Sequence, residues 1–281
     1  MQKAYYYLRW PRGRGKAITL SYDDGVEQDR QLVALMKQHG FRGTFNLNYG
    51  KMPPDGTTYE PGRIHRPMPL SECLKTFSDP DVEVAIHGLT HPFLERLTAP
   101  EVMHEIIEDR KGLEGAFGGV IRGMAYPYGT YSDQVVEVLR LCGVCYARTV
   151  EATQRFDIPK DWLRMPATCH HVHPRLMELA DEFDALQVKK DPALFYLWGH
   201  SYEFERDNNW HVIEQFFIRL GGKDDIWYAT NIEVYDYVKA YEALRFSADG
   251  CRVQNTTATD VWLGNDQGSI CIPAGKTVDL P

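Results

Sequence analysis

The sequence predicts an α/β fold of parallel strands and helices, and three observations support this class. Short apolar segments typical of buried strands recur along most of the 281 residues. Segments with helical periodicity separate them, as in a barrel or a wound sheet of βα units. From residue 246 the chain becomes rich in Thr, Asn, Asp and Gly with alternating apolar residues, which indicates two or three short antiparallel strands.

The predicted strands are short and mostly apolar. In the first of them Ile18, Leu20 and Tyr22 alternate with polar residues, which is the period of a strand. About seven such segments occur before the change in composition. They are residues 16–22, 43–47, 82–86, 123–126, 144–148, 194–198 and 226–229.

The predicted helices lie between these strands. The first ends before Gly40, a residue suited to a helix C-cap, and Thr98 is a candidate N-cap for the long helix after the third strand. Residues 49–69 form a loop rich in Pro and Gly, and a second long loop contains "FDIPKDWLRMP". The helices are residues 28–39, 100–117, 132–142, 174–186, 210–220 and 232–244.

Length, composition and charge indicate the domain organisation and argue against some classes of partner. We expect a (β/α) domain over residues 1–245 and a small antiparallel β appendage over residues 246–281. A net charge of −8 without a basic run argues against a nucleic-acid partner, and no apolar segment approaches the length of a membrane span. The start lacks a secretory signal and the six cysteines lack a disulfide framework, so we expect a cytoplasmic protein. The oligomeric state is not indicated.

Titratable side chains follow several of the predicted strands. Asp23 and Asp24 follow the first strand, His87 and His91 follow the third, and His200 follows the sixth. In parallel βα folds the carboxyl ends of the strands meet at one edge, where catalytic groups collect. We therefore expect these five side chains to lie together, although the Asp-Asp-Gly sequence alone is also typical of a solvated turn.

The residue types at this edge are those of a metal site. Two imidazoles and one carboxylate form a common three-ligand set for zinc, and His87 and His91 with Asp24 would supply it. The charge of the ion would relieve the repulsion between the adjacent carboxylates. Asp23 could then stay ionised and take a proton from a metal-bound water.

Four motifs, in order, resemble those of the polysaccharide deacetylases, carbohydrate esterases that remove acetyl groups from sugars. They are "TLSYDDG", "HGLTH", "AYPYG" and "LWGHS". The resemblance extends over residues 16–244 and implies a distorted (β/α)7 barrel, so we predict this barrel with a small C-terminal β appendage.

The resemblance also implies roles for single residues. Asp23 matches the general base, and Asp24, His87 and His91 match the metal ligands. Tyr128 would donate its backbone N–H to the oxyanion, and His200 matches the general acid. Leu197 would line the acetyl pocket.

Two tryptophans are further candidates for substrate binding. Trp162 and Trp198 could shape the sugar pocket, because sugars stack on aromatic rings, although both could equally be ordinary packing residues. The histidines of "CHHVHP", from His170 onward, suggest a second metal site, but we interpret them as cleft or rim residues.

The chain departs from the family pattern at two motifs. Many members carry an arginine at the position of Ala125, where it orients the base, and the fourth motif is only partly kept in "DIPKDW". We predict that Arg164, just after this motif, supplies the missing cation and holds Asp23.

We expect a metal-dependent carbohydrate deacetylase, a hydrolase of non-peptide C–N bonds that removes acetyl from an N-acetylated sugar or oligosaccharide. It would use one divalent ion, with zinc favoured and cobalt, nickel or iron also compatible. The alternatives are a non-catalytic carbohydrate-binding member of the fold and a cyclic-amide hydrolase resembling the allantoinase branch. An Fe(II) oxygenase ranks lower, because Asp23 would have no role in it.

Overall fold

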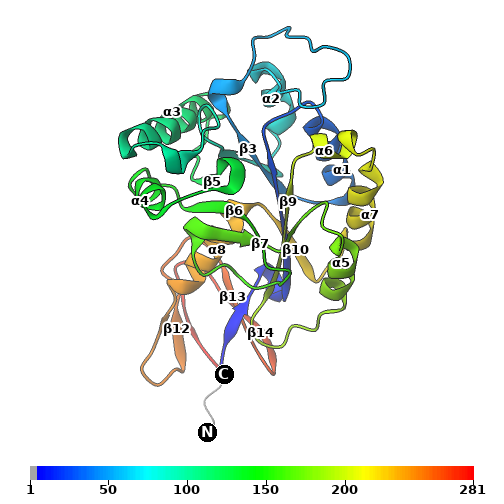
Figure 1. Ribbon diagram of the computed structural model, residues 1–281. Helices are drawn as coiled ribbons and strands as arrows, with labels where there is room; N and C mark the ends of the chain where they lie inside the picture. Colours follow the sequence, from blue (N-terminus) through cyan, green and yellow to red (C-terminus); the bar gives the residue numbers. More distant parts are fainter. Residues whose placement is uncertain (1–4) are drawn as a thin grey trace.

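A parallel sheet of nine strands forms the centre of the computed structural model, which describes residues 5–281 (Figure 1). The strand order is β7-β6-β5-β4-β3-β2-β9-β8, and β10 pairs with the first half of β2. The strands are β2 (Lys16–Asp23), β3 (Gly43–Leu47), β4 (Val82–Ile86), β5 (Gly123–Ala125), β6 (Tyr146–Ala152), β7 (Met165–Ala167), β8 (Cys169–His170), β9 (Ala193–Gly199) and β10 (Ile226–Ala229). All these pairings are parallel, which confirms the predicted α/β class.

The two ends of this sheet are linked by the chain itself. β7 pairs with β6 at one end and β8 pairs with β9 at the other, but only Thr168 separates β7 from β8. The Thr168 N–H donates to the Tyr196 carbonyl of β9 over 2.8 Å. The backbone therefore joins the two edges without one continuous ladder, as expected for a distorted barrel.

Helices surround the sheet (Figure 1). They are α1 (Asp29–His39), α2 (Leu70–Phe77), α3 (Ala99–Phe117), α4 (Asp133–Leu141), α5 (Leu176–Ala185), α6 (Tyr202–Arg206), α7 (Trp210–Leu220) and α8 (Asn231–Glu242). α1 ends at Gly40, whose φ of 71° suits glycine, and Thr98 caps α3 through hydrogen bonds to the Glu101 carboxylate, as predicted. No helix among residues 5–281 is long and apolar enough to cross a membrane.

Strand alternation gives the sheet two distinct faces. Leu20 and Tyr22 of β2 and Leu197 of β9 belong to an apolar cluster that also contains residues of the surrounding helices. Trp198 belongs to a second apolar cluster, on the opposite, inner face of the sheet. Because successive side chains of a strand point to opposite faces, Asp23 lies on the inner face with Trp198. Full burial of each large apolar side chain stabilises the fold by about 1.5–3 kcal/mol.

Two small antiparallel sheets lie at the end of the molecule where the described part of the chain begins and ends (Figure 1). β1 (Tyr7–Arg9) pairs with β13 (Val261–Asn265), which pairs with β14 (Gly268–Ile272). The other sheet contains β11 (Arg245–Phe246), β12 (Arg252–Gln254) and β15 (Thr277–Asp279). β1 thus joins the predicted first domain to the predicted appendage; residues 1–4 of that domain lie outside the described residues.

The sequence did not predict four short elements of the main domain. α2 and α6 were not assigned, and β7 and β8 lie in what was predicted as one long loop. Elements of two to eight residues carry too few turns or alternations to show a period, so packing determines them.

Candidate active site and metal centre

The five predicted side chains converge at the carboxyl edge of the sheet. The Nε2 atoms of His87 and His91 lie 3.8 and 3.7 Å from Asp24 Oδ1. The Nε2 atoms of His87 and His200 each lie 3.8 Å from Asp23 Oδ2. The structure therefore brings together the candidate metal ligands, base and acid.

The turns that carry these residues have an unusual backbone. Asp24, His91 and Tyr128 have φ values of 79°, 59° and 57°, in the left-handed region that non-glycine residues rarely adopt. Half of the six such residues within residues 5–281 are thus at this one site. Strained backbone of this kind concentrates at functional sites.

His87 is held in the orientation of a metal ligand. Its ring is buried, and Nδ1 donates to the Ala125 carbonyl over 2.7 Å. The proton on Nδ1 leaves the Nε2 lone pair facing Asp24. The backbone is also fixed, since the His87 N–H donates to Asp109 of α3 and the Asn48 amide donates to the His87 carbonyl.

His91 completes the three donors beside an aromatic stack. Burial, and then the nearby His87, lower the pKa of His91 to about 4, so its ring is neutral at pH 7. Tyr128 packs edge-on against His91, with ring centroids 4.5 Å apart, and stacks on Phe93 at 3.9 Å. Tyr128 is thus at the site, 52% exposed at its rim.

Arg148, not Arg164, holds Asp23. The fully buried Arg148 guanidinium of β6 donates to Asp23 Oδ2, and Asn46 Nδ2 donates to Oδ1 over 2.8 Å. Burial alone raises the pKa of Asp23, but the charges of Arg148 and His87 outweigh burial and lower it. Asp23 is therefore ionised at neutral pH.

The register of the sheet explains why Arg148 can replace the missing arginine. Ala125 of β5 is the direct cross-strand partner of Arg148 on β6. Paired residues of adjacent strands point to the same face, so an arginine at either position reaches the same interior space. In this chain the arginine therefore comes from β6 rather than from β5.

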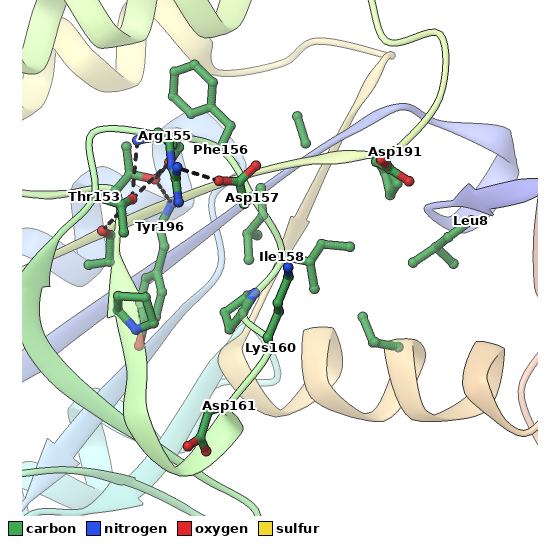
Figure 2. A pocket seen from close by; sticks show the side chains of 18 of the residues that line it. Leu8, Thr153, Arg155, Phe156, Asp157, Ile158, Lys160, Asp161, Asp191 and Tyr196 are labelled. Carbon is green, nitrogen blue, oxygen red and sulfur yellow. Dashed lines mark hydrogen bonds and ion pairs between the residues drawn. The ribbon is translucent and has the colours of Figure 1, made fainter.

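The prediction for Arg164 is wrong. Arg164 donates to Asp161 over 2.7 Å and to Asp133 over 2.6 Å, so its guanidinium binds these two carboxylates and not Asp23. It lines a separate cavity of about 1000 Å³, between β7, the start of β9 and α8, together with Tyr196 and Lys160 (Figure 2). None of the five converging residues lines this cavity.

His200 lies between Asp23 and a second carboxylate. Its Nδ1 is 3.5 Å from Oε2 of Glu203, while its Nε2 faces Asp23. Burial alone lowers the pKa of His200, but Glu203, Asp23 and Asp24 outweigh burial and raise it. The ring therefore holds its second proton more tightly than an ordinary histidine.

Glu203 also faces two histidines of "CHHVHP". The Nε2 atoms of His170 and His171 each lie 3.1 Å from Glu203 Oε2. Val172 N–H donates to His170 Nδ1, so the proton of a neutral His170 ring is on Nε2, toward the carboxylate. The donor atoms of His170, His200 and Glu203 are close enough together to hold an ion. A protonated Nε2 has no lone pair for a metal, however, so we interpret His170 as a cleft residue.

The aromatic and aliphatic candidates divide between the two faces of β9. Trp198 is at the site: the Arg148 guanidinium lies 4.2 Å from its ring, and the His200 ring is 5.7 Å away. Leu197 is fully buried in the cluster on the helix side, so its predicted place in an acetyl pocket is wrong. The cause is strand alternation, which turns adjacent residues to opposite faces.

Trp162 is not brought to the site. Its ring is buried edge-on against Tyr235 of α8, with centroids 5.2 Å apart. Of the two alternatives for Trp162, its burial favours ordinary packing over a place in the sugar pocket.

The sequence did not predict the roles of three residues at the site. Arg148 ends a predicted strand, so the strand-end rule could have found it. Glu203 lies one helical turn from His200, a spacing that also carries a signal. His65, whose Nε2 is 3.1 Å from Asp24 Oδ2, comes from the Pro/Gly-rich loop, where the sequence carries none.

The donor set fits a divalent ion. Donor atoms of Asp24, His87 and His91 lie within 4.8 Å of one another. One carboxylate oxygen and two imidazole nitrogens are donor types that zinc and related divalent ions accept. The tautomer of His87 and the neutral state of His91 both leave lone pairs for it.

Comparison with known proteins identifies one family model that matches this chain. Residues 10–147 match the family model of polysaccharide deacetylases. No curated protein matches the chain.

Two solved structures with TM-scores above 0.5 share the fold at low sequence identity. A candidate polysaccharide deacetylase from Mycobacterium smegmatis is 13% identical, with a TM-score of 0.58, over 85% of this chain and 95% of that one. The CE4 domain of a multidomain xylanase from the hindgut metagenome of Trinervitermes trinervoides is 12% identical, with a TM-score of 0.52, over 80% and 92%. A CE4 family pseudoenzyme from Bacillus anthracis is 16% identical, with a TM-score of 0.49, over 82% and 68%.

Proposed function

Because this chain belongs to the polysaccharide deacetylase family through residues 10–147, we propose that it is a metal-dependent hydrolase that removes acetyl from an N-acetylated sugar or oligosaccharide. One observation carries the proposal. Asp23 Oδ2 lies 3.8 Å from His200 Nε2, and both residues lie beside the three candidate metal donors. The pKa of Asp23 is lowered and the pKa of His200 is raised. Two neighbouring groups with oppositely shifted pKa values are the signature of a base and an acid.

Asp24, His87 and His91 would hold the ion, and zinc suits them best. When bound, the ion supplies Lewis acidity that polarises the acetyl carbonyl and makes water more acidic. The remaining chemistry belongs to the side chains and backbone around these ligands.

Asp23 serves as the general base. Arg148 and Asn46 fix both of its oxygens and keep it ionised, so it can accept the proton of an attacking water. A base that does not rotate loses less entropy on reaching its reactive geometry.

His200 serves as the general acid. Its Nε2–H would pass a proton to the nitrogen that leaves as the amide bond breaks, while Glu203 retains the proton on Nδ1. His200 has 22% of its side chain exposed, so a substrate can reach it, whereas Asp23 has only 3%. Glu203 is a positioning residue, because it acts through His200.

Tyr128 contributes in two ways. Its left-handed backbone places the Tyr128 peptide in the turn beside His91, where its N–H would donate to the oxyanion. Its exposed ring, stacked on Phe93, offers an aromatic surface for a sugar. Trp198 would close the inner side of the acetyl pocket.

Acetate release from N-acetylated oligosaccharides tests the proposal, with zinc content measured in parallel. We expect wild type to release acetate and to contain one zinc per chain. Asp23→Asn should keep the zinc and lose about 10²–10⁴-fold in rate, the usual contribution of a general base. Sugar binding without product would indicate a non-catalytic protein, and turnover of cyclic amides without acetate would indicate the allantoinase-like alternative.

A further inference from the structure

His65 contacts the oxygen of Asp24 that the other donors leave free. His87 and His91 both face Oδ1 of Asp24, whereas His65 Nε2 lies 3.1 Å from Oδ2. An ionised carboxylate only accepts hydrogen bonds, so His65 must donate this proton. The two oxygens of Asp24 therefore have separate partners.

The backbone that follows His65 is anchored to the turn after Asp24. The carbonyl of Gly25 accepts the Met68 N–H over 2.8 Å, and the Glu27 N–H donates to the Arg66 carbonyl over 2.9 Å. Residues 64–68 thus run beside the turn that follows Asp24. This segment, which we term the strap, cannot move away from Asp24 without breaking these bonds.

Side chains tie the strap to α6 as well. Arg66 forms ion pairs with Glu27 and Glu205, at 2.7 and 2.8 Å. Gln28 Nε2 donates both to the Ile64 carbonyl, over 2.7 Å, and to Glu205, over 2.6 Å. The strap therefore joins the turn of Asp24 to the helix that follows His200.

The His65 ring itself packs against this helix. It lies edge-on to Tyr202 of α6, with centroids 5.1 Å apart, and the Tyr202 ring lies 5.3 Å from that of His200. With 38% of its side chain exposed, His65 is held by these contacts rather than by burial.

We propose that His65 is a positioning residue for the metal centre: it binds Asp24 Oδ2 and so directs Oδ1 alone toward the ion. The inference rests on the proposed metal site, and it assigns a role to a loop that no motif covers. A hydrogen-bonded carboxylate keeps one coordination mode, and loss of such an outer partner weakens metal binding about 10- to 100-fold.

Zinc affinity of the metal-stripped protein, measured in competition with a chromophoric chelator, tests the role of His65. We expect His65→Ala to bind one zinc per chain about 10- to 100-fold more weakly than wild type. His65→Gln, which retains an N–H donor, should recover part of the loss. His211→Ala, which removes an exposed histidine of α7, is the matched control and should bind zinc as wild type does.

Cobalt provides a second readout that a general loss of stability would not move. In His65→Ala, Asp24 is free to bind through both oxygens, so the visible absorption of the bound Co²⁺ should weaken. Equal zinc affinity and equal cobalt spectra in wild type and His65→Ala would overturn the role of His65 alone. No zinc uptake by wild type would instead overturn the metal site on which it rests.

Discussion

The two halves of the site are built differently. Asp24, His87 and His91, the proposed metal half, lie in turns that directly follow β2 and β4. In the acid–base half, Asp23 is the last residue of β2 and His200 follows β9, but their partners Arg148 and Glu203 come from β6 and α6. A ligand must occupy a fixed point relative to its strand end, whereas a supporting charge need only reach its partner. Supporting residues can therefore change element while the chemistry remains.

The metal half should show the largest effect. Asp24→Ala removes one of three donors, and we expect zinc content to fall to near zero and acetate release to fall at least about 10³-fold, because Lewis acidity supplies several kcal/mol. Elemental analysis beside an acetate assay checks this. Retained zinc with full activity would mean that the ion is bound elsewhere.

Arg148 tests the support of the base. In Arg148→Ala the pKa of Asp23 should rise, since its main cationic partner is lost. Asp23 must be ionised to accept a proton, so the acid limb of the pH–rate profile should move to higher pH. We expect a loss of about 100-fold in kcat/KM near neutral pH, the lower end of a base's contribution.

A variant in which the arginine is moved from β6 to β5 tests the same support of Asp23. Since Ala125 and Arg148 are register partners, Ala125→Arg combined with Arg148→Ala should recover part of the lost activity and return the acid limb toward lower pH. Ala125→Arg alone places two cations in one space and should be less stable than wild type in thermal melting. A double variant no more active than Arg148→Ala would contradict the exchange of strands.

Replacing Glu203 tests how the general acid His200 is supported. The expected shift of the pH–rate profile is opposite in direction to that for Arg148. Glu203 raises the pKa of His200, and activity that needs the protonated ring is lost as pH rises through that pKa. Glu203→Gln should therefore move the alkaline limb to lower pH, with about tenfold lower activity above pH 8. Glu214→Gln, an exposed change on α7, is the matched control and should leave the limb unchanged. An unmoved limb in Glu203→Gln would mean that Glu203 does not act through His200.

Arg164 should show the smallest effect. Its partners Asp161 and Asp133 have side chains 47% and 96% exposed, and exposed ion pairs contribute about 0–1 kcal/mol. Arg164→Ala should keep acetate release within about twofold of wild type and change the melting temperature little. A tenfold loss of activity would restore Arg164 to the site.

The sequence by itself determined the α/β class and the five converging residues. Strand periods mark where each strand ends, and parallel strands bring their ends to one edge whatever lies between them. Asp23, Asp24, His87, His91 and His200 could therefore be placed without coordinates.

Only the tertiary structure decided the partners of these residues. Arg148 reaches Asp23 through sheet register, which depends on how β5 and β6 pair and not on either strand alone. Leu197 and Trp162 are at packing positions that depend on which face of β9 turns inward and on where α8 lies. His65 arrives from a loop without a period, held by hydrogen bonds to residues distant in the sequence. Such contacts depend on the whole fold, so a local pattern cannot reveal them.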